Sequence, residues 1–127
     1  VGFKLILLRL AMVNFLKSKE EFDKALKEAG ESKLVCLDFT ATWCGPCKKI
    51  GPHFEALAGE ITDADFFKVD VDEAEDVAAA CDISAMPTFV FFKNGKEVHR
   101  FSGASPEKLK EAVEQHVSDG FTTNADF

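Results

Sequence analysis

The chain has 127 residues, of which 46% are hydrophobic and 29% are charged. This length predicts one domain with a core of its own, and the composition excludes collagen, wholesale disorder and a multi-span membrane protein. The formal net charge is −7, which argues against general nucleic-acid binding, because neutralising phosphates requires a basic face.

The two ends of the chain differ in composition from the middle. Residues 1–11 are apolar with two basic residues. This run is too short for a membrane span, and Arg9 interrupts it in a way that makes a poor secretory signal. We interpret it as a peripheral N-terminal extension, with a remnant of a targeting or membrane-contacting segment as the alternative. Residues 118–127 are polar and turn-rich, typical of a mobile tail, which leaves residues 12–117 as the predicted domain.

The middle of the chain alternates between strand and helix patterns. Ser18 and Glu21 form a capping box, and Gly30 ends the helix that they begin. Ser105 is expected to cap the last helix, which Pro106 starts. Asn94-Gly95 is the strongest hairpin signal. In chain order, the predicted elements are strand 13–17, helix 18–29, strand 34–39, helix 44–58, strand 66–71, helix 74–81, strand 88–93, strand 96–101 and helix 106–117.

This order predicts the fold class. Helices join the first three strands, so right-handed parallel crossovers are expected between them. The last two strands form an antiparallel hairpin. The sequence therefore predicts an α/β fold with a mixed five-stranded central sheet flanked by helices on both faces.

Four cysteines are present, but a chain of this size needs no disulfide framework. A chemical role for the cysteines is therefore a better expectation than a structural one. Cys44 and Cys47 stand two residues apart where a buried strand leads into a helix. Unpaired N–H groups and the helix dipole stabilise a thiolate at that helix start, which suits Cys44 as a nucleophile. Cys47 would lie one turn inside and is suited to resolving a mixed disulfide. Pro46 occupies the first turn, where its missing N–H costs little.

The alternative interpretation of this cysteine pair is half of a zinc site, which requires two further ligands. Cys36 lies on a predicted strand, Cys81 ends a distant helix and His53 stands alone. None of them forms a second pair. The strand-then-helix context favours redox chemistry, and no metal is expected.

The segment Trp43-Cys44-Gly45-Pro46-Cys47 is identical to the active-site motif of the thioredoxin family. The resemblance covers about residues 12–117 and is closest to the small cytosolic thioredoxins of eukaryotes. Other segments that resemble the family in the same order are Asp38–Ala41, Ala85–Thr88, Asn94–Lys96 and Phe101–Ala104.

The resemblance implies the thioredoxin fold and a protein-disulfide reductase with no bound cofactor. It implies thioredoxin reductase as a partner, which recharges the protein with electrons from NADPH, and disulfide-containing substrates such as peroxiredoxins. It also implies a cytoplasmic monomer that binds neither membrane nor nucleic acid.

Asp38 is the most informative residue outside the motif. A carboxylate in a buried apolar strand is costly unless it is neutral, paired or functional, and burial should raise its pKa. The resemblance implies that Asp38 accepts the proton of Cys47. The alternative is that the Asp38 carboxylate only caps a turn at the end of the strand. Lys68 lies on the next strand. It is either a partner near Asp38, as in the family, or a solvent-facing residue.

The resemblance also implies a substrate groove. Met86-Pro87 would hold a cis peptide bond that exposes the Met86 backbone to an extended substrate. The alternative is a trans proline that starts a strand. Asp72 either accepts the indole N–H or is an ordinary solvated carboxylate. The residues expected to line the groove are Trp43, Gly45, Pro46, Met86, Pro87, Gly103 and Ala104.

The other cysteines and the histidines carry weaker expectations. Cys36 should be an inert apolar residue, whereas Cys81 ends a helix near the groove, where a thiol can be exposed. The family's dimer-forming cysteine would fall at Ala85, so dimerisation through that position is not expected. Surface positions are expected for the histidines, which are His53, His99 and His116.

Two rival functions remain open from the sequence. One is an isomerase or oxidase on the same fold, although the Gly45-Pro46 spacer favours a reductase. The other is a binding module without catalysis, which has no need for both cysteines together with Asp38.

Overall fold

The computed structural model describes the backbone of residues 13–125 and the side chains of residues 13–118. The predicted extension, residues 1–11, lies outside the described residues. In chain order the elements are β1 (Asn14–Phe15), α2 (Lys19–Ala29), β2 (Leu34–Thr40), α3 (Gly45–Glu60), β3 (Ala64–Asp70), α4 (Glu75–Ala80), β4 (Thr88–Lys93), β5 (Lys96–Ser102) and α5 (Pro106–Ala125).

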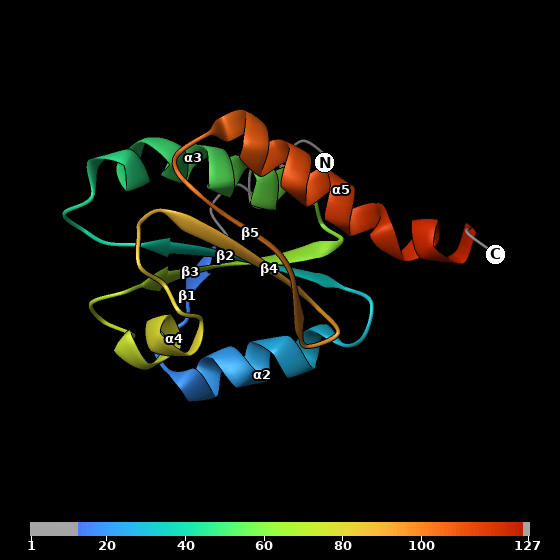
Figure 1. The fold of residues 1–127 in the computed structure, drawn as a ribbon, viewed down its shortest axis with the longest axis horizontal. Coiled ribbons are helices and arrows are strands. Elements are labelled where there is room, and N and C mark those ends of the chain that lie inside the picture. Colours follow the sequence, from blue (N-terminus) through green and yellow to red (C-terminus); the bar gives the residue numbers. More distant parts are fainter. Residues whose placement is uncertain (1–12, 126–127) are drawn as a thin grey trace, which may run out of the picture.

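The strands form one mixed sheet in the order β1-β3-β2-β4-β5. β1 and β2 both run parallel to β3, whereas β4 runs antiparallel to β2 and β5. Helices α3 and α5 cover one face of the sheet, and α2 and α4 cover the other (Figure 1). The predicted five-stranded sheet with helices on both faces is confirmed.

Alternation along the central strand separates two cores, because successive side chains of a strand point to opposite faces. Leu34 and Cys36 of β2 pack with α3 and α5, and Val35 and Leu37 pack with α2 and α4. The alternation places Asp38 on the α3 side. Aromatic rings fill much of the α3 side, where the Phe54 ring contacts the rings of both Phe66 and Phe89.

Two predicted helix starts, those of α2 and α5, are confirmed by their capping bonds. Ser18 Oγ accepts the N–H of Glu21 at 3.2 Å, and the Glu21 carboxylate accepts the N–H of Lys17 at 2.8 Å. Ser105 Oγ accepts the N–H of Lys108 at 3.2 Å. Such caps satisfy N–H groups that the helix itself leaves without partners.

The C-terminal end differs from the sequence prediction. Helix α5 continues to Ala125, so a turn-rich tail beginning at residue 118 is wrong for residues 118–125. The Ser118 hydroxyl donates back to the carbonyls of Glu114 and Gln115 within the helix. The glycine at position 120 weakens a helix by only about 1 kcal/mol, and no proline follows to end it.

Candidate active site

The cysteine pair lies where β2 leads into α3. Cys44 is the residue before the first turn of α3 and has an extended backbone, with φ −90° and ψ 110°. Its sulfur accepts the Cys47 N–H at 3.2 Å. The two residues form a disulfide with a Cα–Cα distance of 5.3 Å. The structure therefore holds the oxidised form of a dithiol pair at a helix N-terminus.

Both cysteines are largely covered by the surrounding chain. Cys44 is 5% exposed and Cys47 is 3% exposed. The spacer residues between them, Gly45 and Pro46, are exposed. Access to the disulfide is therefore over the start of α3.

Trp43 stands beside the pair with 66% of its surface exposed. Its indole Nε1–H donates to the Asp72 carboxylate at 2.8 Å, so of the two alternatives for Asp72 the structure shows the hydrogen-bond acceptor. An exposed ring held by such a bond forms a fixed wall beside Cys44. Packing of Trp43 in the core is excluded.

The loop before β4 approaches the disulfide from the other side. The Met86–Pro87 peptide bond is cis, as predicted. The Met86 carbonyl oxygen lies 3.8 Å from the Cys44 sulfur. Gly103, with φ 104°, donates its N–H to the Pro87 carbonyl at 2.9 Å. Three segments that are distant in sequence thus meet, with Ala104 exposed next to Gly103.

Asp38 is 1% exposed, and its Oδ1 is buried with no hydrogen-bond partner. Burial raises the pKa of Asp38 to about 7, because the charged form loses its hydration; Lys68 opposes this effect and Glu55 reinforces it. A carboxyl group with such a pKa exchanges protons readily near neutral pH.

Lys68 lies beside Asp38 in the parallel register of β2 and β3. Its side chain is only 14% exposed, and its Nζ pairs with Glu55 Oε2 of α3 at 2.5 Å. The solvent-facing alternative for Lys68 is therefore wrong. Glu55 was not identified from the sequence, although Cys47, Gly51 and Glu55 recur every fourth residue along one face of α3.

A cleft of about 300 Å³ opens behind the disulfide. Its lining includes Cys47, Glu55 and Lys68, together with Thr40 and Phe15. The cleft gives solvent a route to the inner cysteine and to the charged pair beside Asp38.

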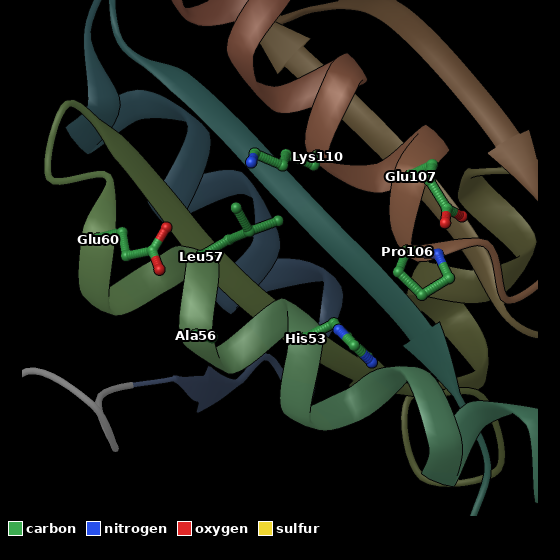
Figure 2. A pocket seen from close by; sticks show the side chains of 7 residues that line it. All are labelled: His53, Ala56, Leu57, Glu60, Pro106, Glu107 and Lys110. Atoms are coloured by element: carbon green, nitrogen blue, oxygen red, sulfur yellow. The ribbon is translucent and has the colours of Figure 1, made fainter.

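A second cleft, of about 280 Å³, lies between α3 and the first turns of α5 (Figure 2). His53, Leu57 and Glu60 line it from α3, and Pro106 and Lys110 line it from α5. None of the predicted site residues contributes to this cleft, so it is separate from the cysteine pair.

Two sequence predictions for the remaining residues are wrong. Cys81 is buried at 6% exposure, because it ends α4 in the core shared with α2, and burial raises its pKa to about 11. His116 is buried at 9% exposure, and its ring stacks on His99 with 5.0 Å between centroids. The prediction that Cys36 is buried is confirmed.

Within residues 13–118, no group of three or more histidine, cysteine or acidic side chains could hold a metal ion. None of the helices in the described part of the chain combines the length and apolar character that crossing a membrane requires.

Comparison with known proteins gives one consistent family. The thioredoxin family model matches residues 13–115. Thioredoxin of Gallus gallus is 52% identical over 106 residues, which are 84% of this chain and all of that protein. The structure of Fasciola hepatica thioredoxin is 48% identical with a TM-score of 0.79, and the match covers 83% of this chain and 99% of that chain.

A further match comes from a structure concerning the thiol-resolving mechanism of yeast mitochondrial 1-Cys peroxiredoxin through glutathione and thioredoxin systems. It is 36% identical with a TM-score of 0.76, and covers 84% of this chain and 98% of that chain.

Proposed function

The chain belongs to the thioredoxin family, and from this premise we propose which residues carry out its reaction. The protein is a thiol–disulfide oxidoreductase that reduces disulfides by dithiol–disulfide exchange. The observation that supports the assignment best is the Cys44–Cys47 disulfide at the N-terminus of α3, next to the cis Met86–Pro87 bond.

Cys44 is the nucleophile. In the reduced protein its thiolate attacks one sulfur of a substrate disulfide, forming a mixed disulfide and expelling the other substrate sulfur as a thiolate. The N–H of Cys47 already points at the Cys44 sulfur. Together with the dipole of α3, this donor stabilises negative charge on Cys44.

Cys47 resolves the mixed disulfide. Asp38 accepts the Cys47 proton, through water in the adjoining cleft, and the resulting thiolate attacks the Cys44 sulfur. The Cys44–Cys47 bond forms, and the second substrate sulfur leaves as a thiolate. Two electrons pass from the cysteine pair to the substrate. Asp38 suits this step because it is buried and its pKa is about 7.

The substrate lies across the exposed mouth of the site. Trp43 forms one wall, Gly45 and Pro46 form the floor, and Met86, Gly103 and Ala104 lie opposite. The Met86 carbonyl, 3.8 Å from Cys44, is placed to pair with the backbone of an extended substrate segment.

Thioredoxin reductase returns the disulfide to the dithiol form with electrons from NADPH, and peroxiredoxins are among the substrates. The family assignment supports the first partner, and the structural match that concerns a peroxiredoxin supports the second. We place the protein in the cytoplasm as a monomer with no bound cofactor, in keeping with its resemblance to small cytosolic thioredoxins. Residues 12–117 form its catalytic domain.

Reduction of insulin disulfides, driven by thioredoxin reductase and NADPH, tests the proposal. Wild-type protein should turn over, and Cys44→Ser should abolish the activity. Cys47→Ser should instead accumulate a mixed disulfide through Cys44, because the resolving thiol is missing. Activity that survives Cys44→Ser would refute the assigned nucleophile.

A further inference from the structure

The resolving cysteine shares one face of α3 with a partly exposed carboxylate. Cys47, Gly51 and Glu55 follow one another at intervals of four residues, so they lie along one side of the helix. Gly51 has no side chain, and the Lys68 Nζ lies 3.6 Å from where a Cβ at that position would stand. The Lys68 side chain therefore passes over Gly51 to reach Glu55.

Two carboxylates compete for the Lys68 ammonium. Asp38 is the register partner of Lys68 across the parallel strands, and its buried Oδ1 has no hydrogen-bond partner. Glu55 holds the ammonium instead, at 2.5 Å. The Glu55 side chain is 43% exposed, so this outer carboxylate stays hydrated while the inner one is left unpaired.

We propose that Glu55 is a positioning residue for the exchange reaction. By holding Lys68 in an ion pair, it keeps the ammonium away from Asp38 and so determines the pH at which Asp38 takes up the Cys47 proton. This inference rests on the proposed role of Asp38 as proton acceptor.

The groups around Asp38 support this assignment. β3 contributes the Lys68 cation, and α3 contributes the Glu55 anion. β4 places the uncharged Phe89 in register with Asp38. Lys68 favours the ionised form of Asp38 and Glu55 favours the protonated form. Loss of the Glu55 charge removes its repulsion and also frees Lys68 to turn toward the unpaired oxygen, so both effects favour ionised Asp38.

One proton moves in the resolving step. The Cys47 thiol loses its proton to the Asp38 carboxylate and becomes the thiolate that attacks Cys44. The proton then leaves Asp38 through the cleft that Glu55 and Lys68 line. A carboxyl group that held its proton too weakly would be a poor acceptor from a thiol, and one that held it too strongly would be occupied at neutral pH.

Glu55→Gln tests the proposal, with Glu60→Gln as the matched control. Glu60 is an exposed residue of the same helix and lines the separate cleft, so this variant makes the same change of charge away from Asp38. Carbon-13 NMR of the Asp38 carboxyl group gives its titration midpoint directly. We expect the midpoint to fall by about half a pH unit or more in Glu55→Gln and to stay unchanged in Glu60→Gln. In a Lys68→Met background, Glu55→Gln should have a smaller effect.

The pH profile of insulin reduction provides the second readout. If the Asp38 midpoint falls and the acid limb of the activity profile falls with it, the inference is supported. If the midpoint falls while the activity profile stays in place, Glu55 controls Asp38 but the proposed role of Asp38 is refuted. A midpoint that stays unchanged or rises in Glu55→Gln overturns the inference itself.

Discussion

Asp38 and Lys68 are register partners across the parallel strands β2 and β3, yet Lys68 pairs with Glu55 of α3. One oxygen of the buried Asp38 carboxyl group is left without a hydrogen-bond partner. The fold therefore leaves a buried carboxyl group partly unsatisfied in the protein interior, at a cost to stability.

The first prediction concerns the pH dependence of the resolving step. Burial raises the pKa of Asp38 to about 7, and only the ionised form accepts a proton. The rate of mixed-disulfide resolution should therefore rise with pH, with a midpoint at about 7. Asp38→Asn should slow the step by about 10²-fold at pH 7 and remove this midpoint. Stopped-flow tryptophan fluorescence at a series of pH values measures both effects, and a variant that keeps the wild-type profile would contradict them.

The second prediction concerns the pH dependence of stability. The pKa of Asp38 is raised by folding, from 3.8 to about 7, so the native state holds this proton more tightly than the unfolded state does. Its contribution to the free energy of unfolding should fall as pH rises through this window, by up to about 4 kcal/mol. Asp38→Asn should lack the loss and be more stable than wild type at pH 8. Urea unfolding of the oxidised proteins at pH 5 and pH 8 measures the difference; an equal pH response in both proteins would refute the prediction.

The third prediction concerns the wall of the groove. Trp43 is the only tryptophan in the sequence, so fluorescence anisotropy reports on its ring alone. Asp72→Ala removes the acceptor of the indole N–H and should lower the anisotropy. It should also reduce kcat/KM for insulin by about fivefold, which corresponds to about 1 kcal/mol for one lost hydrogen bond. Asp72→Asn retains an acceptor oxygen and serves as the control; identical behaviour of the two variants would argue against the bond.

The fourth prediction concerns the two cysteines outside the active site. Cys36 and Cys81 are buried, and burial raises the pKa of both thiols, so neither should react as a thiolate in the folded protein. A thiol reagent should label Cys44 rapidly in the reduced native protein and label Cys36 and Cys81 only after denaturation. Mass spectrometry of the labelled peptides distinguishes the sites. Native labelling of Cys81 at the rate of Cys44 would show that its burial is not maintained.

Local sequence signals predicted the fold and part of the site. The capping serines, the Asn94-Gly95 turn and the strand-to-helix position of the cysteine pair each act over a few residues, and each is found as predicted. Asp38 could be identified from the sequence alone, because a carboxylate within an apolar strand is unusual whatever elements that strand packs against.

The remaining features depend on packing between distant elements. The ion pair of Glu55 with Lys68 forms only when α3 lies against β3, and the sequence shows no more than the spacing of Glu55 from Cys47. His116 is covered because α5 lies beside the ring of His99 on β5. Cys81 is buried because α4 packs against the sheet. No local sequence pattern in any of these segments indicates the contact that the segment makes.

The reduction potential of the Cys44–Cys47 couple is the most direct test of the reductase assignment. Equilibration of the protein with a dithiol redox buffer, followed by quantification of the Cys44–Cys47 disulfide, measures it. Thioredoxins typically have a potential of about −270 mV, and we expect a value close to this for the Cys44–Cys47 couple. A value of about −180 mV or higher, in the range of isomerases and oxidases, would contradict it.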